Sequence, residues 1–179
     1  MSKVTVPFTA EYLRSRVSYD PATGVFVWLA HPGKANGHRA WDRQWAGKQI
    51  AVREVQSPSG GGVYLIFRFL GRWYGAHRIA WLYMTGVWPE AEIDHRDCDS
   101  LNLKWDNLRA ATRGQNQANK RPMRNNWLGI KGVYKRRSKY AAQINDGGTR
   151  HIGSFNCPTA ASIAFAREHR RIHGEFSRI

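Results

Sequence analysis

The organisation of this chain is easiest to establish from the stretch IDHRDCDSLNLKWDNLRAATRGQNQANK, residues 93–120. A short strand is predicted to run into Asp94 and His95, a polar loop follows, and a second strand is predicted from Asn107. A helix is then expected from about Thr112, whose hydroxyl can cap the first helical turn. Asn107 follows His95 by twelve residues, and Asn116 lies nine residues further on. A single Asp-His pair is more often structural and a loop Asn usually belongs to a turn, but the joint spacing is specific.

The charge of the chain favours a nucleic-acid partner. Its 179 residues include 28 Lys and Arg against 13 Asp and Glu, a formal net charge of +15. Solubility alone, a ribosomal role or a membrane-surface role would also suit a basic chain, but phosphates favour Lys and Arg through counterion release. Residues 107–145 contain no acid, whereas residues 90–106 are rich in acids. A divalent metal among these carboxylates would reconcile the two blocks.

The sequence also indicates a cellular setting. It contains no run of about 18 apolar residues, so no membrane span is expected. Residues 1–10 lack the basic start and the long apolar stretch of a secretory signal. Cys98 and Cys157 are the only cysteines, too few for a zinc ribbon or a disulfide framework. A reducing, cytoplasmic location is therefore expected.

Residues 1–75 are predicted to form a β-rich N-terminal region. A strand is expected at 25–28, and a hairpin over 63–74 closes at Leu70-Gly71. Residues 57–62 are expected to be a flexible loop. The basic, Gly-rich stretch 31–48 is also predicted to be a long loop, and the sequence leaves open whether it contacts DNA.

The region after this N-terminal part begins with a predicted helix at 77–84, which has helical apolar spacing and stops at Thr85-Gly86. His77 opens this helix and is interpreted as a structural residue. The polar stretch 93–120 follows, and residues 121–128 are predicted to be a basic linker because they lack apolar periodicity.

The C-terminal part is predicted to be a three-stranded sheet packed on one helix. The strands are expected at 132–135, 139–145 and 149–155, and Asp-Gly-Gly at 146–148 is a strong hairpin signal. A helix is expected over 158–173, with Pro in its first turn and Gly at its end. Strand alternation assigns four apolar residues to the face against the helix. These are Val133, Ala142, Ile144 and Ile152.

The block from Ile93 to Asn119 resembles the HNH family of endonucleases. The resemblance covers about 75–120 and implies the ββα-metal fold, in which two short strands and a helix hold one divalent ion. It implies that His95 is the general base, and that Asn107 accepts a hydrogen bond from the other imidazole nitrogen. It also implies that Asp94 and Asn116 are metal ligands, with Asn119 as the alternative to Asn116.

The ligand types implied by this resemblance favour a hard metal ion. Carboxylate and amide oxygens suit Mg²⁺ above all, and Mn²⁺ is possible. Many relatives have His where this chain has Asn116, which lowers the expectation of Zn²⁺ or Ni²⁺. Asn at this position is similar to the homing-type members of the family.

Residues 129–176 resemble the plant ethylene-response-factor DNA-binding domain, through Gly129 to Tyr134, Lys139 to Asp146 and Ile152 to Phe155. The resemblance implies that the open face of the sheet lies in the DNA major groove. Several positions depart from the plant pattern, so the target sequence does not carry over, and Gln and Asn can pair with adenine edges. The alternative is a sheet that only grips phosphate. The expected DNA-binding residues are Lys131, Tyr134, Arg136, Arg137, Lys139, Gln143, Asn145, Arg150 and His151.

These patterns predict an α+β chain: a β-rich N-terminal region (1–75), a central ββα-metal nuclease (76–120), a basic linker (121–128) and a C-terminal DNA-binding module (129–179). The layout is similar to that of small phage-encoded HNH proteins, so the expected activity is metal-dependent cleavage of double-stranded DNA. One constellation without an internal repeat predicts a monomer that nicks one strand. A non-cleaving, sequence-specific DNA-binding regulator and an RNA-binding accessory protein are the alternatives.

Overall fold

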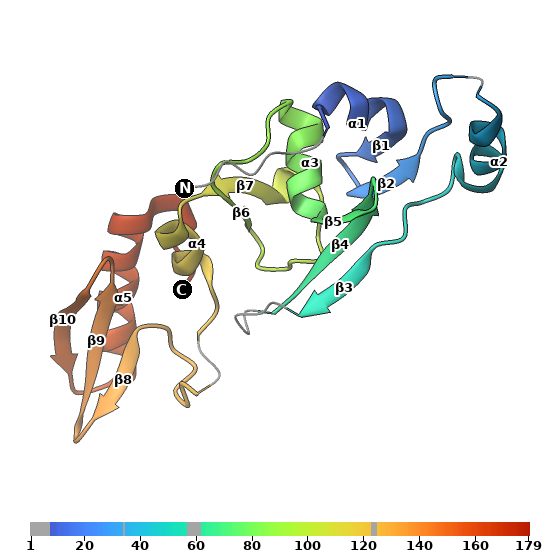
Figure 1. Ribbon diagram of the computed structural model, residues 1–179. Helices are drawn as coiled ribbons and strands as arrows, with labels where there is room; N and C mark the ends of the chain where they lie inside the picture. Colours follow the sequence, from blue (N-terminus) through green and yellow to red (C-terminus); the bar gives the residue numbers. More distant parts are fainter. Residues whose placement is uncertain (1–7, 34, 57–61, 123–124) are drawn as a thin grey trace. The chain divides into compact units, whose positions relative to one another are not determined.

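The computed structural model describes residues 8–33, 35–56, 62–122 and 125–179 (Figure 1). It divides into two compact units, residues 1–110 and 111–179, and each is described by itself below. Small sheets of two or three strands alternate with short helices along the chain. Within the described ranges, no helix is both long and apolar enough to cross a membrane.

The first unit opens with a helix, an antiparallel strand pair and a three-stranded antiparallel sheet. α1 (Ala10–Arg16) is capped by Thr9 and leads into β1 (Val17–Asp20), which pairs with β2 (Val25–Trp28). β3 (Arg53–Gln56), β4 (Val63–Phe69) and β5 (Arg72–Gly75) form an antiparallel sheet with β4 in the centre. The predicted strand at 25–28 and the hairpin at Leu70-Gly71 are confirmed, and both turn residues have positive φ. The loop predicted at 57–62 lies outside the described residues except for Gly62.

The prediction of a long loop over 31–48 is wrong, because residues Asn36–Trp45 form the helix α2. The helix is held by Trp41, whose ring packs edge-on against Trp28 at 5.3 Å between centroids. The guanidinium of Arg16 lies over the same indole, 4.7 Å from its centroid. Aromatic and cation–π contacts with residues far along the chain therefore stabilise a segment whose own composition favours a loop.

α3 (Ala76–Thr85) contributes buried residues to the core of the first unit and precedes the polar stretch of the sequence. It buries Ile79, Ala80 and Leu82 and ends at Gly86, which adopts a left-handed conformation (φ 81°). The core that it joins is built mainly from α1, β1, β2 and β4. Its largest fully buried side chains include Leu13, Val17, Phe26, Phe67 and Ile79.

β6 (Glu92–His95), the 3₁₀ turn η1 (Trp105–Asn107) and β7 (Leu108–Ala111) follow α3, and β6 pairs with β7. The N-terminal hairpin braces the loop before η1. The hydroxyl of Tyr19 donates to the carbonyl of Leu103 (2.5 Å), and the N–H of Trp105 donates to the carbonyl of Pro21 (2.9 Å). A Cβ on Gly24 would lie 2.7 Å from the backbone of Leu103, so this close approach requires glycine.

The second unit starts with α4 (Arg113–Asn119), whose N-cap is Thr112 as the sequence predicts; Thr112 and Gln115 form a reciprocal capping box. β8 (Val133–Arg136), β9 (Lys139–Asn145) and β10 (Thr149–Phe155) form an antiparallel sheet with β9 in the centre. α5 (Pro158–His173) packs on this sheet, and η2 (Gly174–Phe176) follows it. The predicted core face is found, with Val133, Ala142 and Ile144 buried and Ile152 packed against them.

Candidate functional site

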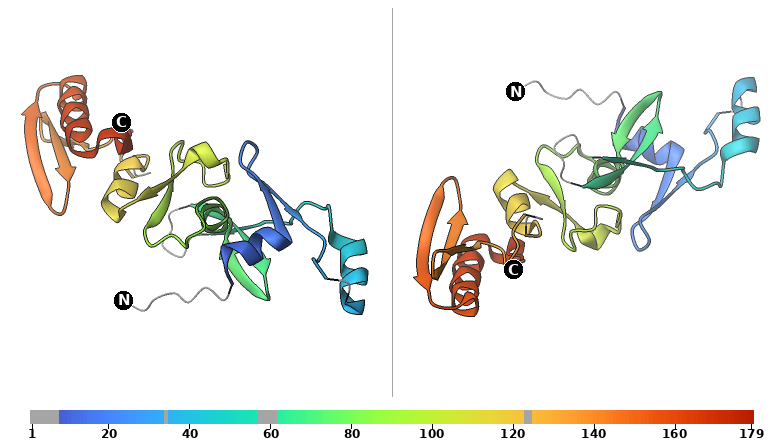
Figure 2. Two further views of the ribbon diagram at one scale, coloured as in Figure 1. Left: turned by 90° about the horizontal axis from the view of Figure 1, so that it is seen from above. Right: turned by 90° about the horizontal axis from the view of Figure 1, so that it is seen from below.

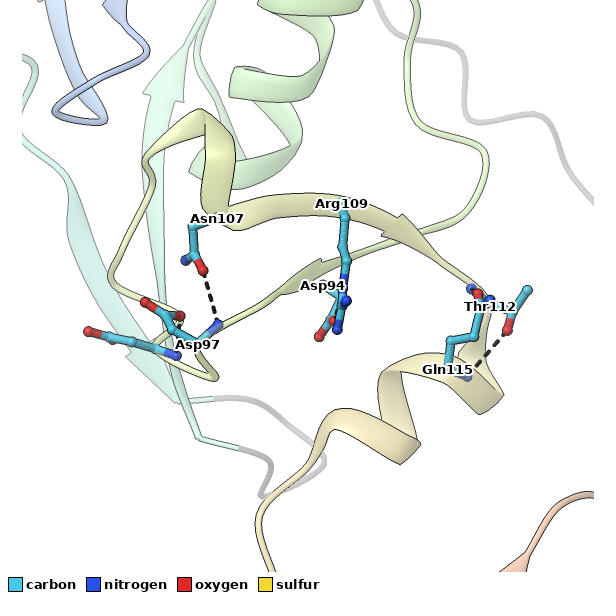
Figure 3. Close-up of polar contacts among 7 residues, drawn as sticks. Asp94, Asp97, Asn107, Arg109, Thr112 and Gln115 are labelled. Carbon is cyan, nitrogen blue, oxygen red and sulfur yellow. Dashed lines mark hydrogen bonds and ion pairs between the residues drawn. The ribbon is translucent and has the colours of Figure 1, made fainter. Parts of the chain in front are cut away.

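Asp94 lies on β6 and forms a buried ion pair with Arg109 on β7. The Nε of Arg109 donates to Oδ2 of Asp94 at 2.8 Å, and the two side chains are only 7% and 5% exposed (Figure 3). The two strands are neighbours in one sheet, which brings these side chains together. Removing either partner would leave a charge buried in a poorly solvating environment, so the pair is a fixed feature of the site.

His95 is the last residue of β6 and packs against a second histidine, His77 at the start of α3. The two rings meet edge to face, with 5.5 Å between centroids. Burial lowers the pKa of His95, and the carboxylates of Asp94, Asp97 and Asp99 oppose that shift. A lowered pKa keeps the imidazole neutral near pH 7, which is the form that can accept a proton.

Asn107 fixes the loop between His95 and β7. Its Oδ1 accepts a hydrogen bond from the N–H of Asp97 (3.0 Å), and its Nδ2 donates to the carbonyl of Asn102 (2.9 Å). Figure 3 shows the amide turned toward Asp97. The resemblance implies that this oxygen accepts from the imidazole of His95, whereas in the structure it accepts from the backbone N–H of Asp97, two residues after the histidine.

Other polar side chains complete the same loop. Oδ2 of Asp97 accepts from Nδ2 of Asn102 (2.7 Å), and Oδ1 of Asp97 accepts from the N–H of Asp99 (2.8 Å). Asn102 also accepts a hydrogen bond from the N–H of Lys104 through its Oδ1 (3.2 Å). The loop that follows His95 is thus held by side chains as well as by backbone.

Asn116 and Asn119, the two candidate helix ligands, both lie on α4 in the second unit. Asn119 is buried, whereas Asn116 is half-buried. The C-terminal end of α4 is tied to the rest of its unit by Lys131. The ammonium of Lys131 donates to the carbonyls of Ala118, Lys120 (2.7 Å) and Arg178 (3.3 Å).

Residues 74–118 match the family model of the HNH endonucleases. The matched segment contains Asp94, His95, Asn107 and Asn116, and it supports a nuclease. It is much shorter than the chain, so it describes the central segment only. Comparisons with the curated proteins and with the solved structures gave no match.

The donor atoms in the HNH segment suit a hard divalent cation. Asp94 offers a carboxylate and Asn116 an amide oxygen, and oxygen donors of this kind favour Mg²⁺ or Mn²⁺ over softer ions. In the described parts of the chain, no group of three His, Cys, Asp or Glu side chains is arranged to hold a metal ion. The oxygen donors of Asp94 and Asn116 therefore fit a hard divalent ion by their chemistry.

The sheet of the second unit presents a polar face opposite α5. Ala142 and Ile144 of β9 are buried toward the helix, so Gln143 and Asn145 lie on the other face. The register places His151 beside Gln143, and Arg136 beside Lys139. The outward residues on this face, together with Arg137 in the hairpin turn, are the candidates for DNA contact. They are Tyr134, Arg136, Arg137, Lys139, Gln143, Asn145 and His151.

Two further predicted DNA-binding residues have other partners in the structure. Arg150 pairs with Ile144 in the strand register, on the side of the sheet that faces α5. Its guanidinium donates to Oε1 of Glu168 on that helix at 2.5 Å. Lys131 is occupied by the three backbone carbonyls described above. Both side chains therefore contribute to the internal structure of the second unit.

Sequence reasoning did not assign a role to Arg109 and interpreted His77 as structural. Arg109 lies directly within the predicted second strand, but its pairing with Asp94 depends on the register of two strands. Nδ1 of His77 is buried without a hydrogen-bond partner among the residues that the structure describes. Burial, with a smaller contribution from His95, lowers the pKa of His77 to about 3. His77 lies within the matched segment 74–118, as does His95, and is the second residue of α3.

Proposed function

We propose that this chain is a metal-dependent endonuclease that cuts one strand of duplex DNA. The observation that carries the proposal is the pairing of two features on β6 within the HNH segment. Asp94 is a buried carboxylate with a fixed orientation, and His95 beside it is kept neutral by burial. A fixed oxygen ligand next to a neutral base supplies two groups that metal-assisted phosphodiester hydrolysis can use, a metal ligand and a proton acceptor.

In the proposed reaction, His95 accepts a proton from the water that attacks the phosphorus atom. The bond from phosphorus to the 3′ oxygen breaks, and this oxygen takes a proton from solvent. The products are a 5′-phosphate and a 3′-hydroxyl. Asp94 and Asn116 would hold Mg²⁺, or Mn²⁺ in its place, and such an ion when bound stabilises the negative charge that develops on the phosphate.

Asn107 acts in this proposal through the loop rather than through a direct contact with the imidazole. Its amide anchors the backbone at Asp97 and Asn102, on either side of the turn that follows His95. Because the N–H of Arg96 donates to the carbonyl of Asn107 (2.9 Å), the backbone at Asn107 also holds the residue after His95. Asn107 therefore keeps the strand end that carries the base in place.

The open face of the second unit's sheet is proposed to bind the DNA duplex. Arg136, Arg137 and Lys139 would contact phosphates, and Gln143 and Asn145 would reach base edges. Tyr134 and His151 lie on the same face and would flank these contacts. We propose internal structural roles for Lys131 and Arg150, because their cationic groups are engaged within the unit.

Incubation with supercoiled plasmid tests this function. We expect conversion to the relaxed form with Mg²⁺ or Mn²⁺, and none with EDTA. The variant His95→Ala should bind DNA without relaxing it. Binding without relaxation at any metal concentration would support the non-cleaving DNA-binding alternative. Relaxation that persists in EDTA would contradict metal dependence and indicate a contaminating activity.

A further inference from the structure

The carboxylate of Asp94 is neutralised by the protein itself. Arg109 contacts it at 2.8 Å, and neither side chain is more than 7% exposed. A buried guanidinium is not withdrawn from a buried carboxylate without leaving both charges poorly solvated. A cation that approaches Asp94 therefore meets an ion pair whose net charge is zero.

The neighbouring groups add little negative charge at this place. The two histidines at this place, His95 and His77, carry no negative charge in either protonation state. Asp97 and Asp99 are exposed to solvent, where water and salt screen their charges. Asp97 is further engaged with Asn102 and with the backbone of Asp99.

We propose that Arg109 acts as a built-in counter-cation that makes metal binding conditional on DNA. This inference rests on the proposed endonuclease function and concerns the order in which its parts assemble. The guanidinium repels a divalent ion and occupies one oxygen of its principal ligand, so the free protein holds the ion weakly. A DNA phosphate supplies the negative charge that the protein lacks. The site of the free protein is therefore not permanently occupied by a metal ion.

Thermodynamic linkage gives this inference a quantitative form. If DNA raises the affinity for the metal by some factor, the metal must raise the affinity for DNA by the same factor. We expect that factor to be at least about tenfold, the lower part of the range that is typical of coupled sites. It should decrease when Arg109 loses its charge, because the carboxylate of Asp94 then lacks its guanidinium partner.

Calorimetric titration of Mn²⁺ into the full-length His95→Ala protein, alone and saturated with a DNA duplex, tests the inference without cleavage. We expect at least tenfold tighter binding in the complex, and an equal Mn²⁺-dependent gain in DNA affinity in a separate fluorescence titration. Equal Mn²⁺ affinity with and without DNA would overturn the role of Arg109 and leave the endonuclease proposal standing. Absence of Mn²⁺ binding even with DNA would contradict the endonuclease proposal itself.

Two substitutions at Arg109 separate charge from structure. Arg109→Gln should raise the Mn²⁺ affinity of the free protein and shrink the effect of DNA, whereas Arg109→Lys keeps the charge and should keep the effect. Arg72→Gln, on the exposed strand β5 of the same unit, removes one charge elsewhere and should change neither value. An identical DNA effect in Arg109→Gln and in the parent, with both folded by circular dichroism, would also overturn the inference.

A second, independent observation concerns α2, which stands apart from the other helices of its unit in all three views (Figures 1 and 2). Its one acid, Asp42, is engaged with His31. Oδ1 of Asp42 accepts from the backbone N–H of His31 (3.0 Å) and contacts Nδ1 of the same residue (2.7 Å). Trp41 holds the helix to Trp28 and Arg16. The exposed charges that remain on the helix and the turn after it are basic.

We infer that α2 provides a second contact with the DNA backbone, separate from the C-terminal sheet. Arg39 and Arg43 are four residues apart and so are neighbours on one side of the helix. Lys48 follows in the next turn, beside the half-exposed ring of Trp45. The outward surface formed by Arg39, Arg43 and Lys48 is cationic and complements duplex phosphates. The contacts of Trp41 fix this surface relative to the strands of the unit.

The salt dependence of DNA binding by the full chain tests the role of α2. Each lost phosphate contact reduces the slope of log K against log salt by about 0.9. Arg39→Ala with Arg43→Ala should therefore reduce it by about 1.8 without changing the thermal midpoint. The matched double variant Arg53→Ala and Arg72→Ala removes equal charge from exposed strand positions of the same unit, and should leave the slope nearly unchanged. Equal slopes in both double variants and in the parent would overturn this inference.

Discussion

At His95, a single half-buried side chain is the proposed base. His95→Ala should abolish cleavage and leave DNA affinity within a few-fold, because a base is not a phosphate anchor. Asn107→Ala should lower the cleavage rate about 10- to 100-fold, the usual effect of removing a supporting hydrogen bond near a metal site. Gel assays of cleavage and binding on the same duplex measure both effects. Undiminished turnover in His95→Ala would refute the assignment of the base.

His77 gives the first unit an acid-sensitive stability. Its pKa is about 3 in the fold and about 6.5 in an unfolded chain, so the unfolded state binds the proton more readily. The stabilising contribution is present above pH 6.5 and is lost as the pH falls toward 3. His77→Phe keeps an aromatic ring and cannot titrate. Between pH 7 and pH 5, protonation of His77 in the unfolded state should lower the unfolding free energy of the parent by up to about 2 kcal/mol. His77→Phe should lack this part of the decrease.

Urea titrations followed by tryptophan fluorescence measure this difference. Of the eight tryptophans, only Trp127 lies beyond residue 110, so the signal reports mainly on the first unit. Thr85→Ala, on the same helix but without a titrating group, is the control for a general loss of stability. If His77→Phe and the parent lose the same free energy between the two pH values, His77 is not the acid-sensitive group.

At the scale of elements, the alternation of side chains along β9 predicts which of them reach the DNA bases. Gln143→Ala or Asn145→Ala should relax sequence preference, because their side chains lie on the open face and can pair with base edges. Arg137→Ala, in the hairpin turn, should weaken binding to all sequences alike. Selection from a random DNA library, followed by titration of selected and random duplexes, compares the three variants. Equal losses on both duplexes for all three would mean that the sheet reads no bases.

The elements also separate what sequence can predict from what it cannot. β9, β10 and α5 have the predicted bounds, because their alternation and their Gly and Pro boundaries are local signals. α2 was missed because Trp41 is held by Trp28 and Arg16 rather than by its own neighbours. α1 was missed although its cap, Thr9, is a local signal.

The candidate site shows the same division. The spacing of Asp94, His95, Asn107 and Asn116 was sufficient to identify the HNH segment. The ion pair of Asp94 with Arg109, and the packing of His77 on His95, follow from strand register and helix placement. Contacts of this kind depend on tertiary structure, which residue spacing does not specify. The sequence therefore indicates the HNH segment and its proposed site residues better than the contacts that position them.

At the scale of the whole molecule, the number of sites limits the number of strands that can be cut. The chain contains one Asp-His…Asn…Asn constellation, and one site directs one water at one phosphate. The apolar faces of α3 and α5 are used for internal cores, through Ile79 and Leu82 in one helix and Phe165 in the other. One apolar surface open to a second copy is a hollow between β10 and α5, which the exposed Ile163 helps to line.

We therefore predict that the protein acts as a monomer and nicks one defined strand. Cutting both strands would require a second subunit related by two-fold symmetry, or a second binding event in the reverse orientation. A target duplex labelled on each strand in turn should show one cleaved strand, and sedimentation velocity at the same concentration should show a monomer. Ile163→Glu should alter neither result, because it would disrupt only a dimer formed through the hollow beside α5. Equal cleavage of both strands in a single binding event by the monomer would refute the prediction; equal cleavage that Ile163→Glu abolishes would identify a dimer instead.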